Sequence, residues 1–65
     1  MDYAGRITVD DAGGSRFQIH EFRGRRFLVR IRRFVLDTGE RVKRIDFENY
    51  EVASTGERLV RIDGR

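Results

Sequence analysis

The chain has 65 residues, of which 38% are charged, and its 14 basic and 11 acidic side chains give a net charge of +3. This length allows one domain, residues 1–65, with a thin core, because so short a chain buries only about 60% of its unfolded surface. The chain has no Cys and a single His, which excludes disulfides and the usual zinc sites, and it lacks the roughly 20 consecutive apolar residues of a membrane span.

The first residues have neither the basic start nor the apolar run of a signal peptide. We therefore expect a soluble cytoplasmic protein that does not associate with membranes, and the initial Met is typical of a complete small reading frame. No phosphate loop, nucleophile elbow or metal-ligand spacing is present, so we expect no metal and no cofactor.

Segments rich in Val, Ile, Phe and Tyr alternate with short turn signals along the chain, which is typical of β-strands. No Pro interrupts these segments. The predicted strands, in chain order, span residues 5–10, 16–22, 26–36, 41–47, 51–53 and 58–62. The predicted turns lie at residues 11–14, 23–24, 37–40 and 54–57.

The third predicted strand is the longest, and its apolar pattern changes phase. Every second position from Phe27 to Ile31 is apolar, which predicts one buried face. The period shifts by one residue at Arg32-Arg33, because Phe34 begins the next apolar set. Similar shifts recur at residues 43–44, between the apolar Val42 and Ile45, and at residues 60–61, between Leu59 and Ile62. Such shifts are what β-bulges produce, so we expect a strongly coiled sheet.

Part of the chain is repeated. Residues 35–46 return as residues 52–63, with eight of twelve positions identical. Each copy has Thr-Gly-Glu between apolar runs, which predicts strand, turn and strand because Gly accepts the positive φ of a tight turn. We interpret the turns as hairpin chemistry rather than as a pair of binding loops.

These patterns predict an all-β fold: an antiparallel meander of five or six short strands, coiled or closed into a small barrel of SH3-like or OB-like character by analogy of strand count and size. A short helix at residues 46–54 is the structural alternative, because Asp46 could cap it. Because packing alone must stabilise so small a core, a homodimer that adds packing between two copies is a further possibility.

The positive charge is concentrated in one segment. Residues 16–33 contain seven Arg and one acidic residue, Glu21, a local balance of +6, whereas the flanking segments have balances of −2 and −1. On a strand, Arg30 and Arg32 share a face. Arg suits phosphate recognition because its planar fork donates bidentately. The candidate residues for binding nucleic acid or another polyanion are Arg23, Arg25, Arg26, Arg30, Arg32 and Arg33.

Aromatic rings in the strands could stack on bases if they are exposed. Those considered are Phe17, Phe22, Phe34 and Tyr50. The alternative for the basic segment is a solvated face whose charges are answered by acids on neighbouring strands.

Catalytic signals are weak. His20 is the only side chain that titrates near neutral pH, and Ser15 with Glu21 makes a poor match for it as nucleophile and base. The acidic set Asp46, Glu48 and Glu51 lacks the spacing of a calcium loop. We therefore expect no catalytic residues and no enzyme.

Two classes of function remain. The first is a small binding module whose Arg-rich face contacts nucleic acid or another polyanion. The second is a protein-interaction adaptor or inhibitor that uses an exposed strand edge, or that associates with itself.

Overall fold

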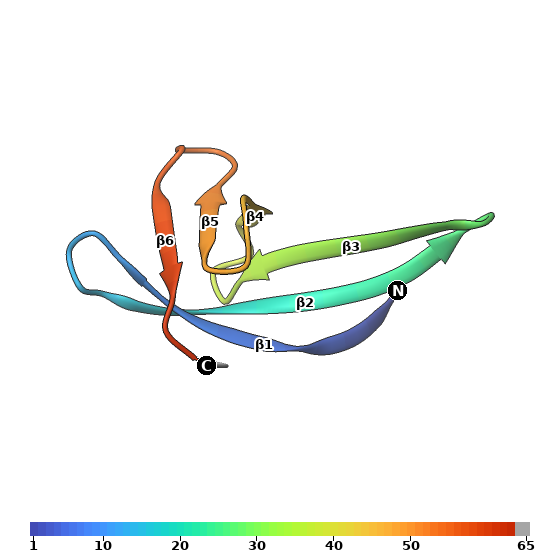
Figure 1. Cartoon of the computed structure of the whole chain (residues 1–65), viewed down its shortest axis with the longest axis horizontal. Coiled ribbons are helices and arrows are strands. Elements are labelled where there is room, and N and C mark those ends of the chain that lie inside the picture. Colours follow the sequence, from blue (N-terminus) through green and yellow to red (C-terminus); the bar gives the residue numbers. More distant parts are fainter. Residues whose placement is uncertain (64–65) are drawn as a thin grey trace.

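The computed structural model describes residues 1–63, which form six strands and contain no helix (Figure 1). The strands are β1 (Asp2–Asp11), β2 (Arg16–Arg26), β3 (Val29–Leu36), β4 (Arg41–Arg44), β5 (Asn49–Val52) and β6 (Arg58–Arg61). The all-β prediction is confirmed, and the helix alternative for residues 46–54 is wrong, because β5 occupies the middle of that segment. No helix that could span a membrane occurs in the described chain.

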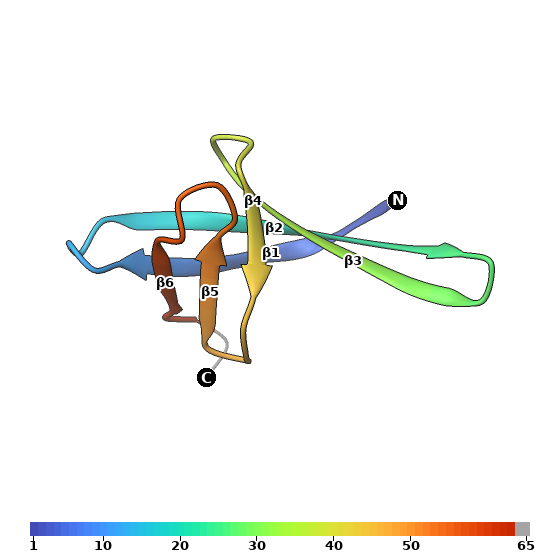
Figure 2. The ribbon, with the colours of Figure 1, turned by 90° about the horizontal axis from the view of Figure 1, so that it is seen from above.

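The six strands form a closed barrel in chain order, each antiparallel to the next. β6 closes it on β1 through the pairs Val9 with Arg61, Asp10 with Val60 and Asp11 with Leu59. The three short strands β4 to β6 cross over only one part of the long strands β1 to β3 (Figure 2). The small antiparallel barrel that the sequence predicts is therefore confirmed, but its first three strands are longer than closure requires.

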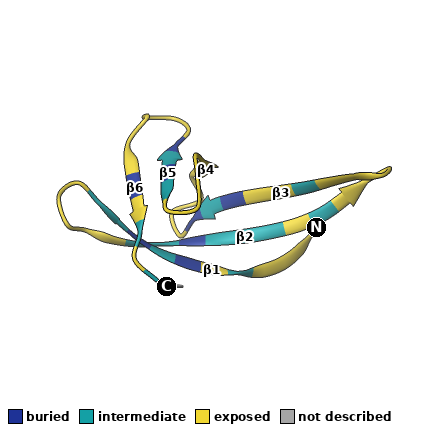
Figure 3. Ribbon diagram, in the orientation of Figure 1, coloured by how far each residue is buried: buried dark blue, intermediate teal, exposed yellow. Residues whose placement is uncertain are grey.

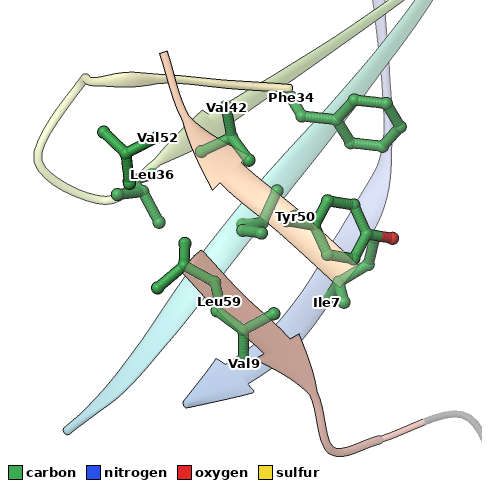
Figure 4. Close-up of a cluster of buried hydrophobic side chains, with 9 residues drawn as sticks. Ile7, Val9, Phe34, Leu36, Val42, Tyr50, Val52 and Leu59 are labelled. Carbon is green, nitrogen blue, oxygen red and sulfur yellow. The ribbon is translucent and has the colours of Figure 1, made fainter. Parts of the chain in front are cut away.

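The core consists of alternate residues of the six strands, whose side chains point into the barrel. On β1 and β2 these include Ile7, Val9 and Ile19, and Phe34 contacts Tyr50 edge to face with ring centroids 5.7 Å apart (Figure 4). The buried set is Ile7, Val9, Ile19, Phe34, Leu36, Val42, Tyr50, Val52 and Leu59. Each large apolar side chain contributes about 1.5–3 kcal/mol on burial, so this cluster supplies most of the stabilising energy.

The predicted bulges at residues 32–33, 43–44 and 60–61 are wrong. β2 and β3 pair without a slip from Ile19 opposite Leu36 to Arg26 opposite Val29. Among residues 1–63 the register shifts only in β1, between Tyr3 and Gly5. The apolar phase of β3 changes for another reason: its C-terminal part lies in the barrel, whereas its N-terminal part projects beyond it (Figures 1 and 3).

The turn predicted at residues 23–24 is also wrong. Gly24 lies within β2, opposite Ile31, and the reversal comes at a two-residue loop, Phe27-Leu28. A Cβ on Gly24 would lie 3.0 Å from the Cγ of Met1, so the N-terminal residue packs on this part of the strand. Gly24 therefore accommodates a neighbouring side chain and is not a turn residue.

The repeated segments form the two hairpins that the sequence predicts, β3 with β4 and β5 with β6. Gly39 has φ +91° and Gly56 has φ +74°. The N–H of Gly39 donates to the carbonyl of Leu36, and that of Gly56 to the carbonyl of Val52, both at 2.8 Å. The Thr-Gly-Glu turns thus fit the hairpin interpretation, because each uses the positive φ that Gly accepts.

Candidate functional site

A hairpin projects from the barrel. β4 pairs with β3 only at Phe34 and Val35, so the rest of β3 continues with β2 beyond the barrel wall. We call this projecting hairpin, residues 22–33, the arm (Figures 1 and 2). β1 accompanies β2 as far as Asp2 opposite Arg23, so the arm is two-stranded from Gly24 to the tip. The arm gives the molecule its elongated shape, with extents of 40 × 27 × 20 Å.

All six candidate arginines lie in the arm, on two faces. Arg23 is opposite Arg32 and Arg25 is opposite Arg30. These four share the face that points into the barrel further along, because directly paired residues and every second residue lie on the same side of a sheet. The structure therefore brings four of the predicted residues together on what we call the inner face.

The other two candidates are separated from this group. Arg33 is opposite Phe22, and Arg26 is opposite Val29. Both belong to the opposite face of the arm, the outer face, by the same alternation. A ligand lying on the inner face would meet Arg26 only at the tip, where the ribbon ends.

Two carboxylates lie on the inner face, Glu21 and Asp2, which is opposite Arg23, and Glu21 is the one that forms ion pairs with the arginines. The Nε of Arg23 donates to Glu21 Oε2 at 2.6 Å, and the Nε of Arg32 lies 3.4 Å from the same oxygen. The Glu21 side chain is only 13% exposed. Within residues 1–63, no carboxylate forms an ion pair with the four remaining candidates. These are Arg25, Arg26, Arg30 and Arg33. Ion pairs thus involve two of the six arginines, and only the pair of Arg32 with Glu21 joins neighbouring strands, because Arg23 and Glu21 both lie on β2.

Two further arginines lie at the mouth of the barrel, next to the arm. Arg44 is opposite Tyr50 on β5, and Arg61 is opposite Val9 on β1, so both belong to the inward-pointing set. The guanidinium carbon of Arg61 lies 4.6 Å from the centroid of the Phe47 ring, a cation–π contact.

Two clefts connect the arm with this mouth. The first, about 740 Å³, is an open groove lined by Asp2, Arg23, Gly24, Arg25, Arg30, Ile31 and Arg32. The second, about 330 Å³, includes Arg44, Phe47 and Arg61 in its wall. Both clefts share Arg23 and Arg32. The inner face of the arm and the barrel mouth thus form one continuous basic surface.

Arg44 and Arg61 were missed as candidates although the sequence contains a signal for them. They occupy the same position in the two copies of the repeat, each two residues after a core residue, Val42 or Leu59. Residues at this spacing on a strand share a face. The apolar pattern grouped Val42 with Ile45 instead, which placed Arg44 on the outside. Ile45 in fact lies beyond β4 and is exposed.

Each copy of the repeat ends in an aspartate whose backbone carbonyl accepts a hydrogen bond from the arginine at the barrel mouth in the same copy. The Nε of Arg44 donates to the carbonyl of Asp46 at 3.2 Å, and the Nε of Arg61 donates to the carbonyl of Asp63 at 3.1 Å. The Asp46 carboxylate accepts hydrogen bonds from the Asn49 side chain and from the N–H groups of Glu48 and Asn49, which lower its pKa. These bonds fix the loop that follows β4.

Asp63 performs the same task at the end of β6. Burial raises the pKa of its carboxyl, but hydrogen bonds from the Thr8 backbone and from Arg61 outweigh burial and lower it. The bond from the Thr8 N–H is 2.8 Å long. This carboxylate therefore ties the end of β6 to β1 and sets the position of Arg61.

The aromatic rings that are exposed in the structure are not the ones that the sequence offered for base stacking. Phe34 and Tyr50 are buried, and Phe17 is half-buried against the core, so these rings are not free to stack on a base. Phe22 is half-buried on the outer face, where it meets Tyr3 edge to face at 5.4 Å. The exposed phenylalanines are Phe27 and Phe47, at 91% and 50% exposure.

His20 belongs to a side-chain series on the outer face. The hydroxyl of Tyr3 lies 2.9 Å from His20 Nδ1, and His20 Nε2 is hydrogen-bonded to an Asp37 carboxylate oxygen. Glu21 points to the opposite face, so it is not the partner of His20. None of the members of this Tyr–His–Asp series lines either cleft. The series joins β1, β2 and the loop after β3.

The described part of the chain contains no group of three or more His, Asp or Glu side chains that could hold a metal ion. Comparison of the chain with protein-family models, with curated proteins and with solved structures found no match. The functional argument therefore rests on the geometry of the basic surface.

Proposed function

We propose that this protein binds nucleic acid with the inner face of the arm and the mouth of the barrel. The observation that carries the proposal is the pairing of like charges: Arg25 faces Arg30 directly, and neither forms an ion pair within residues 1–63. Like charges opposite one another destabilise a strand pair. A phosphate between them would relieve this repulsion and would accept the bidentate hydrogen bonds that guanidinium groups favour.

The arrangement of the charges suits an elongated polyanion. Successive same-face pairs on a sheet are about 6.6 Å apart, because each residue advances the strand by about 3.3 Å. The inner-face pairs therefore form a line that leads from the tip of the arm to Arg44 and Arg61 at the mouth. Phe47, half-exposed beside Arg61, offers a ring on which a base can stack.

Binding of this kind is dominated by counterion release. If four guanidinium groups contact phosphates, affinity for a duplex falls with salt at a log–log slope of about −3.6, which is about 100-fold between 50 and 200 mM. Phosphate contacts carry no sequence information, so we expect little preference between sequences.

The test is fluorescence anisotropy of the protein with labelled single-stranded and duplex oligonucleotides at these two salt concentrations. Tight binding at the lower salt, with a steep loss at the higher, is the expected result. Absence of binding at low salt, or binding that is indifferent to salt, would contradict the proposal.

A protein partner is the second candidate, because β3 leaves residues 29–33 unpaired on the side away from β2. A free strand edge can accept another strand. Arg30, Arg32 and Arg33 lie on this edge, and charged residues are what discourage strand addition. Nucleic acid is therefore the better fit to the same segment.

A further inference from the structure

The tip of the arm is apolar and fully exposed. Phe27 is 91% exposed, Leu28 93% and Val29 64%, and none of them packs on the core. The sequence predicts that Phe27 and Val29 lie on a buried face, but both are exposed. The end of the hairpin between β2 and β3 is coloured as exposed throughout (Figure 3). A folded chain of this size gains nothing from exposing three adjacent apolar residues.

The backbone at the tip is also strained. Phe27 has φ +57°, and no other residue than Gly has a positive φ in the described chain. A two-residue hairpin whose first central residue has positive φ normally carries Gly there. A side chain in this conformation costs about 1–2 kcal/mol. Such strain at an exposed position points to a role for the ring outside folding.

Positive charge surrounds the apolar tip. Arg26 lies opposite Val29, and the next pair along the arm is Arg25 with Arg30. None of the three arginines forms an ion pair within the part of the chain that is described. The tip therefore has apolar side chains at its end and guanidinium groups without ion pairs behind them. This arrangement is complementary to a ligand that has an apolar interior between rows of phosphates.

We propose that Phe27 and Leu28 form a wedge that inserts between stacked base pairs of duplex nucleic acid, while the arginines behind them hold the flanking phosphates. This inference rests on the proposed function and adds the duplex as the ligand class. Proteins that bend duplexes insert apolar side chains between base steps in this way. From Gly24 to the tip the arm is a two-stranded ribbon, which is narrow enough to enter a groove.

Two other occupants fit the tip less well. A membrane is a plane that would meet only the end of the arm, so it would not contact Arg23, Arg32 or the mouth of the barrel. A second copy of the chain would bring two arms of the same charge together, which like-charge repulsion opposes.

The test uses a short duplex that contains 2-aminopurine, whose fluorescence rises when the base unstacks. The intact chain is compared with a variant carrying Phe27→Gly and Leu28→Ser. The Gly accepts the positive φ of this turn, so the hairpin is retained. The matched control carries Ile45→Ser and Val60→Ser, which remove two apolar side chains exposed elsewhere on the barrel.

The intact chain and the control are expected to raise the fluorescence at saturation, and the tip variant is not. The tip variant should lose roughly tenfold in affinity, as expected for one lost stacking contact, and keep the salt slope because no phosphate contact is lost. Binding of the intact chain without a fluorescence rise would overturn the wedge and leave the proposed function standing. Failure to bind any oligonucleotide would overturn both.

Vesicles of phosphatidylserine provide a further comparison. Binding to these vesicles that requires Phe27 and Leu28, together with a tip variant that still unstacks the duplex, would assign the tip to a lipid surface and overturn the inference.

Discussion

The arm and one wall of the barrel are built from the same two long strands, β2 and β3, yet their inner faces have opposite chemistry. Inside the barrel, the inward positions of β2 and β3 hold Ile19 and Leu36, which are buried under β4 to β6. Further along, the same alternation brings Arg25 and Arg30 to the inner face, and no strand within residues 1–63 covers them. Strand alternation thus determines the face on which a residue lies, whereas the strands that pack over that face, here β4 to β6, determine whether it is buried.

The largest effect that separates the two regions is on stability. Leu59→Ala removes a core side chain that is 1% exposed and is expected to cost about 2–5 kcal/mol, a large part of the stability of so small a domain. Leu28→Ala at the tip should change stability by less than about 0.5 kcal/mol. Urea unfolding followed by circular dichroism measures both, and similar losses would mean that the tip packs against something.

A smaller effect concerns the carboxylate at the junction of arm and barrel. Glu21→Gln removes the one acid that holds Arg23 and Arg32 on the inner face. We expect binding to an oligonucleotide at low salt to tighten about fivefold, the equivalent of the roughly 1 kcal/mol that two charges 4 Å apart exchange in water.

The matched control for Glu21→Gln is Glu51→Gln, which breaks the ion pair with Arg58 on the outside of the barrel. This change should leave affinity unaltered. Weaker binding by Glu21→Gln would indicate that Glu21 positions the two arginines for the ligand instead of competing with it.

Local patterns predicted the barrel well. The Thr-Gly-Glu turns of the repeat fix two hairpins, since Gly39 and Gly56 supply the positive φ that each requires. The apolar set that begins at Phe34 gave the correct inward residues for the C-terminal part of β3. These features were predictable because each depends on residues close together in the chain.

The arm was not predictable in the same way. Its turn has Phe27-Leu28 where turn chemistry expects Gly or Asn, and Gly24 drew the predicted turn to the wrong place. The burial expected for Phe27 and Val29 needs a covering layer, and β4 is too short to supply one. The length of a strand and its coverage by other strands depend on residues far apart in the chain. The hydrophobic period of one segment therefore does not predict them.

The candidate site was predicted in part. The six arm arginines are visible as a charge cluster, and the shared face of Arg30 and Arg32 is confirmed by their register. Arg44 and Arg61 were hidden because closure of the barrel, which brings distant strands together, is what places them beside the arm.

The most direct test of the basic surface is charge reversal. Arg30→Glu with Arg32→Glu alters the inner face, and Arg16→Glu with Arg58→Glu makes the same charge change at the end of the barrel away from the arm. Both double variants are first checked for an intact fold by circular dichroism. Affinity for a labelled duplex is then compared at 50 mM salt.

The inner-face variant is expected to lose at least about 100-fold in affinity, because two charge-assisted hydrogen bonds of about 1.5–3 kcal/mol each disappear. The other variant should change by less than about threefold, because screening removes most of the effect of distant charges. Equal losses in the two folded variants, or no loss in the first, would contradict the assignment of the arm as the binding surface.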